Sequence, residues 1–110
     1  MNYDYIDENV MVKVIIKNKD NLLANATVVL STPFGKVTIK NFQIWKSRIH
    51  NSRLGESINI VPTSNGKYKQ VFFEDTDKWF VLEKIIFNTF IKSKEDYIDV
   101  DEIDKGISEQ

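Results

Sequence analysis

The chain has 110 residues and a mass of 12.8 kDa, the size of one ordinary domain. Hydrophobic residues make up 42% of it, which is enough to bury a core and excludes a disordered or fibrous protein. The absence of cysteine excludes disulfides, thiolate catalysis and cysteine-based metal sites, and favours a cytoplasmic location. The N-terminus lacks the features of a signal peptide and no apolar run is long enough for a membrane span, so we expect no membrane association.

The net charge of -1 conceals an uneven distribution of charge along the chain. Residues 36–73 contain seven basic residues and one acidic residue, whereas residues 95–110 contain one basic residue and seven acidic residues. One interpretation is that both segments are ordinary solvated surface. The other is a basic face that binds a polyanion, followed by a tail that competes with that polyanion.

Alternating apolar residues predict strands over most of the first 73 residues. The predicted elements are strands over residues 10–17, 23–31 and 37–44, a loop over 46–56, and strands over 57–62 and 67–73. In the third strand, the apolar residues before and after Lys40–Asn41 are out of phase, which predicts a β-bulge there. The dipeptide Asn65-Gly66 predicts a type I′ hairpin turn before the last strand.

A helical period begins after residue 75, where Asp75, Thr76 or Asp77 can cap the first turn. Over residues 79–91 the apolar side chains cover more of the helix than one sheet face needs. A second partner would cover the surplus, so we predict a homodimer, with packing inside the chain as the alternative. The predicted dimer interface consists of Trp79, Leu82, Ile86 and Phe90.

This order of elements predicts an α+β fold, with an antiparallel sheet of about five strands followed by a long C-terminal helix. We expect residues 1–94 to form the single domain. Residues 95–110 are expected to form an acidic tail that is either a frayed helical extension or disordered.

Side chains that could carry out catalysis are scarce. His50 is the only histidine and lies in the predicted basic loop. The carboxylates of Glu74, Asp75 and Asp77 suit a helix start better than an acid–base pair or a metal site. The sequence has no glycine-rich phosphate loop and no nucleophile elbow. We therefore expect no enzyme, no metal, no cofactor and no small-molecule substrate.

The basic segment has the composition of a nucleic-acid interface, because spaced basic residues neutralise phosphates and exposed aromatic rings stack on bases. Trp45 and Tyr68 lie in this segment, out of phase with the positions expected to be buried; the alternative for Trp45 is a place in the dimer interface. No motif for a recognition helix is present. The predicted nucleic-acid-binding residues are Lys40, Lys46, Arg48, Arg53, Lys67 and Lys69.

Four short patterns resemble the SpoVG (stage V sporulation protein G) family of bacterial septation regulators. They are Lys40-Asn41-Phe42-Gln43-Ile44, Ile58-Asn59-Ile60-Val61-Pro62-Thr63, Gly66-Lys67-Tyr68-Lys69 and Ile85-Ile86-Phe87-Asn88-Thr89-Phe90. The resemblance implies a small α+β subunit that dimerises through strands and the C-terminal helix. It also implies a cytosolic DNA- and RNA-binding regulator without a cofactor.

The chain departs from the family pattern at three places. At the start of the helix, Trp79 and Val81 stand where the family has Arg and Lys. Ser64-Asn65 stands where the family has a basic residue, and the loop over residues 46–56 is longer than the family turn. The predicted basic groups would then lie in that loop. The alternative function is a non-catalytic protein–protein interaction module that keeps the fold without binding nucleic acid.

Overall fold

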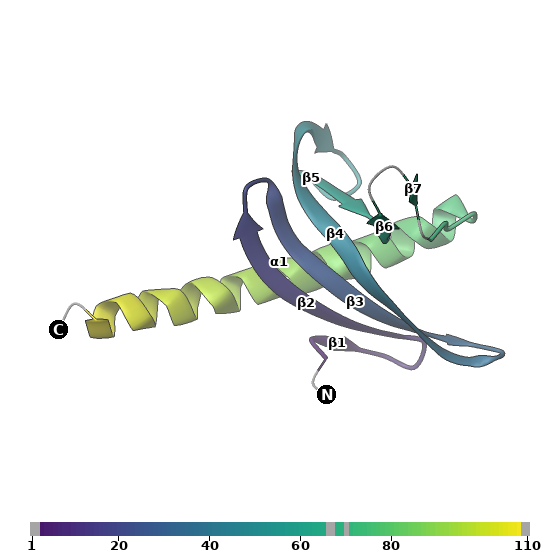
Figure 1. Ribbon diagram of the computed structural model, residues 1–110, viewed down its shortest axis with the longest axis horizontal. Helices are drawn as coiled ribbons and strands as arrows, with labels where there is room; N and C mark the ends of the chain where they lie inside the picture. The colour runs from purple at the N-terminus through teal and green to yellow at the C-terminus, as the bar shows by residue number, and fades with distance from the viewer. Residues whose placement is uncertain (1–2, 66–67, 70, 109–110) are drawn as a thin grey trace.

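The computed structural model describes residues 3–65, 68–69 and 71–108, and the side-chain surroundings of residues 3–63 and 71–96. A five-stranded antiparallel sheet precedes one long helix, which confirms the predicted α+β fold class (Figure 1). The sheet consists, in chain order, of β1 (Tyr5–Ile6), β2 (Val10–Lys19), β3 (Leu22–Thr32), β4 (Gly35–Asn51) and β5 (Glu56–Val61). A separate hairpin pairs β6 (Ser64–Asn65) with β7 (Tyr68–Lys69), and helix α1 spans Thr76–Ser108.

One face of the sheet, which we call the inner face, forms the core together with α1. Because side chains alternate along a strand, directly paired residues of neighbouring strands share a face. The inner rows are Val12–Val28–Ile39, Val14–Ala26–Phe42 and Ile16–Ala24–Ile44–Ile60. Leu82, Ile86 and Phe90 of α1 join the same cluster from successive helical turns. Burying each of these side chains contributes about 1.5–3 kcal/mol, so the inner face determines how α1 packs.

The pairing of β3 with β4 contains the predicted bulge. Ala26 pairs with Phe42 whereas Val28 pairs with Ile39, so β4 has one residue more than β3 in this interval. Asn41 has a φ angle of 68°, in the left-handed region that asparagine tolerates better than most residues. The extra residue keeps Phe42 on the inner face, where it is 0% exposed. The bulge prediction is therefore confirmed.

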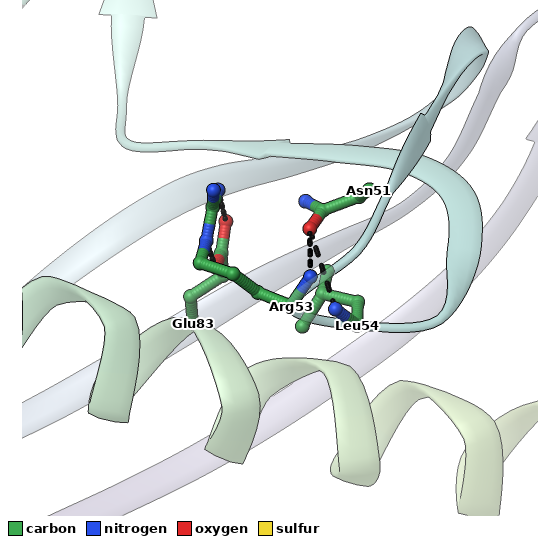
Figure 2. Close-up of polar contacts among 4 residues, drawn as sticks. All are labelled: Asn51, Arg53, Leu54 and Glu83. Atoms are coloured by element: carbon green, nitrogen blue, oxygen red, sulfur yellow. Dashed lines mark hydrogen bonds and ion pairs between the residues drawn. The ribbon is translucent and has the colours of Figure 1, made fainter.

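The β4–β5 turn covers a second side of α1. The side-chain oxygen of Asn51 accepts hydrogen bonds from the backbone N–H groups of Arg53 (3.0 Å) and Leu54 (3.3 Å), as Figure 2 shows. The chain reverses at Gly55, whose φ angle is 73°. This turn places Leu54 in the core, where it is 5% exposed.

Three elements differ from the sequence predictions. The predicted loop over residues 46–56 is wrong, because β4 continues to Asn51 and only the tight turn separates it from β5. The fifth strand of the sheet is β1, whose Tyr5 pairs with Val12, rather than residues 67–73. Tyr68–Lys69 pairs only within the separate hairpin, and residues 71–75 form no strand. Gly66, in the predicted turn, lies outside the described residues.

Helix α1 determines the long dimension of the molecule. Its 33 residues, rising 1.5 Å each, span about 50 Å, close to the longest extent of 54 Å. The helix packs against the sheet in its N-terminal part and continues past the edge of the sheet toward Ser108 (Figure 1). It therefore crosses the predicted domain boundary at residue 94 without interruption. Within the described part of the chain, no helix combines the length and the apolar character that crossing a membrane needs.

Candidate nucleic-acid interface

The face of the sheet turned away from α1 carries the candidate interface, and we call it the outer face (Figure 1). Its paired rows are Ser31–Lys36, Met11–Val29–Thr38, Lys13–Thr27, Ile15–Asn25–Gln43–Val61 and Lys19–Leu22–Trp45–Asn59. Strand alternation adds Lys17 and Lys40 to this face. The same β-pairing that buries the inner rows therefore gathers these polar and basic side chains on one surface.

Lysines dominate the charge of the outer face. It contains Lys13, Lys17, Lys19, Lys36 and Lys40. Within the described strands β2–β5 the single carboxylate is that of Glu56, at the first position of β5, and Asp20 lies in the β2–β3 turn. Residues 21–55 contain no acidic residue at all. Such an arrangement concentrates positive potential on this surface of the sheet.

Between the lysines runs a strip of aromatic, aliphatic and amide groups. Trp45 is half-buried, and its indole N–H donates a hydrogen bond of 3.0 Å to the side-chain oxygen of Gln43. Ile15 is 47% exposed. The side-chain oxygen of Asn25 is buried in this strip and has no hydrogen-bond partner within the described residues. The strip thus offers an apolar surface and amide groups next to cations, which suits contact with bases beside phosphates.

The six predicted basic residues do not share one face. Lys40 lies on the outer face, but Lys46 pairs with the core residue Ile58 and so belongs to the opposite side of β4. Arg48 is exposed and follows Lys46 by two positions along the same strand. Because this segment is a strand rather than a loop, alternation separates its basic side chains from Lys40. Lys67 lies outside the described residues, as does the side chain of Lys69.

Arg53 is held by an ion pair inside the molecule (Figure 2). Its Nε donates to Oε1 of Glu83 at 3.0 Å and its Nη2 donates to Oε2 at 3.2 Å, and Glu83 is only 2% exposed. The guanidinium also lies over the ring of Phe80, 4.2 Å from its centroid. The hydrogen bonds that Arg53 donates to Glu83 raise the pKa of Arg53 above its ordinary value. Arg53 therefore fastens the β4–β5 turn to α1, and its expected role in nucleic-acid binding stays a prediction for a side chain that is 46% exposed.

The residues predicted for a homodimer interface belong to the core of the chain itself. Leu82, Ile86 and Phe90 are at most 6% exposed. Trp79 is half-buried, with its ring centroid 5.2 Å from that of Phe73. The sheet and the β4–β5 turn therefore cover Leu82, Ile86 and Phe90 within the chain, whereas Trp79 keeps part of its surface exposed. The homodimer stays a prediction, although three of its four expected interface residues lie in the core of the chain.

The basic residues that the sequence analysis missed come from β2. Lys13 and Lys17 alternate with core residues, a pattern that is visible in the sequence. Only the sheet register places Lys13 beside Thr27, and thereby on the same surface as Lys40. Charge totals by segment could not reveal this, because the β2 lysines lie in residues 1–35, where three basic residues stand against four acidic ones.

A shallow hollow lies at the far end of the sheet, beside the β4–β5 turn. Its lining includes Ser47, Ile49 and His50, so the predicted loop histidine borders it. Within the described residues, no group of three or more histidine or carboxylate side chains could hold a metal ion. The hollow presents hydroxyl, amide, imidazole and aliphatic groups, and Arg53 is the one Lys, Arg, Asp or Glu in its lining.

The resemblance to septation regulators consists of four short sequence patterns, so we also compared the whole chain with known proteins. Comparison with protein-family models, with curated proteins and with solved structures finds no match.

Proposed function

We propose that this chain binds nucleic acid on the outer face of its sheet, as a small non-catalytic regulatory protein. The observation that carries the proposal is a sheet face turned away from α1 on which the described strands β2–β5 carry five lysines and no carboxylate. Lysine side chains on such a face neutralise phosphates and release counterions, which is the main source of affinity in non-specific binding. The function implied by the family resemblance agrees with this proposal.

The outer face suits a single strand or an irregular region of nucleic acid, whose phosphates and unpaired bases it could contact. It suits the groove of a duplex less well. The N-terminal part of α1 is packed against the sheet, and its continuation carries the acidic segment that begins at Glu95. A helix with these properties does not suit insertion into a groove lined by phosphates. The strip around Trp45 instead offers a surface on which unpaired bases can stack.

Salt-dependent binding of a fluorescent oligonucleotide tests this proposal. The outer-face variant combines Lys13→Gln, Lys17→Gln and Lys40→Gln. The control variant combines Lys78→Gln, Lys84→Gln and Lys92→Gln, which also removes three positive charges, all from exposed positions of α1. We expect affinity to fall steeply with salt, and each outer-face substitution to reduce the slope by roughly 0.7 to 1.

The control makes the result specific to one surface. The α1 variant should bind with the affinity and salt slope of the unmodified chain, and both variants should retain its circular dichroism spectrum. No binding at about 50 mM salt would contradict the proposal and favour the protein–protein interaction module. Equal losses in the two variants would show that net charge, rather than the outer face, determines binding.

A further inference from the structure

The β3–β4 hairpin carries at its tip a phenylalanine that none of the described residues covers. Phe34 is 98% exposed, more than any other large apolar side chain of the described residues. The hairpin extends beyond the part of the sheet that α1 covers (Figure 1). Exposure of a whole aromatic ring is unfavourable in water and gives the fold no packing in return. The whole ring is therefore accessible to a partner, and the case for one depends on how the turn holds the ring and on the charge beside it.

The turn holds this ring in a defined position. The Thr32 hydroxyl accepts a hydrogen bond of 3.1 Å from the backbone N–H of Phe34 and donates one of 2.6 Å to the carbonyl of Gly35. Gly35 has a φ angle of 105°, which other residues rarely adopt. Pro33 restricts the backbone immediately before Phe34. The ring is therefore presented by a constrained turn, which lowers the entropy lost on binding.

The stem of the hairpin has the charge of a phosphate-binding surface. Lys36 follows Phe34 by two residues, and Lys40 continues along the same side of β4 toward Lys13 on the outer face. Acidic residues near the N-terminus contact the base of the hairpin. There the Ser31 hydroxyl donates a hydrogen bond to the backbone carbonyl of Glu8. An aromatic tip on a cationic stem complements a ligand that alternates flat apolar rings with anions.

We propose that Phe34 stacks on an unpaired nucleobase, so that the chain binds single-stranded nucleic acid in preference to duplex. This inference rests on the proposed function and extends it from the outer face to the hairpin tip. An unpaired base exposes both faces of its ring, whereas a base in a duplex is covered by its neighbours. One ring and one adjacent cation match one base and one adjacent phosphate.

Binding of a fluorescent oligothymidine of about 16 nucleotides, compared with a duplex of equal length, tests the inference. Phe34→Ala should lower affinity for the single strand by about 5- to 100-fold, the effect of losing one base–aromatic stack, and affect the duplex less. Phe34→Tyr should retain the affinity, because it keeps the ring, and Phe34→Leu should resemble the alanine variant. Ile49→Ala is the matched control, since Ile49 is 78% exposed on the other hairpin.

The outcomes separate this inference from the function on which it rests. Unchanged binding by Phe34→Ala, together with weaker binding by the outer-face lysine variant, would overturn the stacking inference and leave the proposed function in place. Full affinity of Phe34→Leu, or equal losses for single strand and duplex, would also overturn it. Absence of binding by the unmodified chain would overturn both. Phe34-dependent binding to phosphatidylserine vesicles, without an effect on the oligothymidine, would assign the tip to membranes instead. Each variant should unfold at the same urea concentration as the unmodified chain.

Discussion

Removing the guanidinium of Arg53 should destabilise the fold, because it leaves the carboxylate of Glu83 buried without its partner. Both carboxylate oxygens accept hydrogen bonds from Arg53, and Glu83 is 2% exposed. Breaking a fully buried ion pair on one side costs about 3–5 kcal/mol. The Arg53 side chain is 46% exposed, so water can reach and screen the remaining charge. We therefore expect Arg53→Met to lower the free energy of unfolding by about 2–3 kcal/mol.

A double-mutant cycle measured by urea unfolding distinguishes the ion pair from simple loss of packing. Glu83→Gln alone should cost about 1–2 kcal/mol, because the amide oxygen can still accept one hydrogen bond from Arg53. The double variant should lose at least about 1 kcal/mol less than the sum of the single losses. Arg48→Met is the control, since Arg48 is exposed on the same hairpin, and should change stability by less than about 0.5 kcal/mol. Additive losses, or an unchanged midpoint for Arg53→Met, would refute this account of the β4–β5 turn.

Three further predictions concern the fold. Phe90→Ala should lower the free energy of unfolding by about 3–5 kcal/mol, because Phe90 is 2% exposed. Val81→Ala, at a position that is 60% exposed, should lower it by less than about 0.5 kcal/mol, and similar losses for the two variants would contradict the assignment of the core. The hydrogen bond from the backbone N–H of Asn9 lowers the pKa of Asp7, so its stabilising contribution is present at neutral pH and is lost as the pH falls through the folded pKa. Asp7→Asn should therefore be less stable than the unmodified chain at neutral pH, by a difference that shrinks as the pH falls through the folded pKa of Asp7; a constant difference would exclude the charge as the cause. Asn41→Val should cost about 1–2 kcal/mol more than Asn41→Gly, because a β-branched residue resists the left-handed conformation, and equal unfolding midpoints would argue against a bulge at this residue.

Local alternation predicted the central strands because each has one buried side. The apolar residues of β2 and β3 repeat every second position, and the phase change near Asn41 revealed the bulge. The end of β4 was not predicted because residues 46–51 bury few apolar side chains. Their polar composition therefore resembles that of a loop. β1 has only two residues, too few to show any period.

Long-range pairing limited the prediction of the candidate site. Arg53 and Glu83 are thirty positions apart in the sequence, and neither has a local feature that marks the other as its partner. The wide apolar arc of α1 suggested a second copy because a single sheet face covers only one side of a helix. Leu54 lies in the β4–β5 turn, within the region predicted as a loop, and it covers part of the apolar surface of α1 that the sheet leaves exposed.

The bulge in β4 has a consequence for the curvature of the sheet. A chain shortened by Asn41 alone would keep Ile39 and Phe42 on the inner face, because the remaining residues would then alternate regularly. Such a deletion would preserve the side-chain pattern of both faces and remove the local bend and added twist that a bulge introduces. The β4–β5 turn would then lie farther from α1, and the Leu54 amide should exchange its hydrogen faster; unchanged exchange would show that the bend is set elsewhere. On this reasoning we expect the one inserted residue at Asn41 to bring the β4–β5 hairpin closer to the helix.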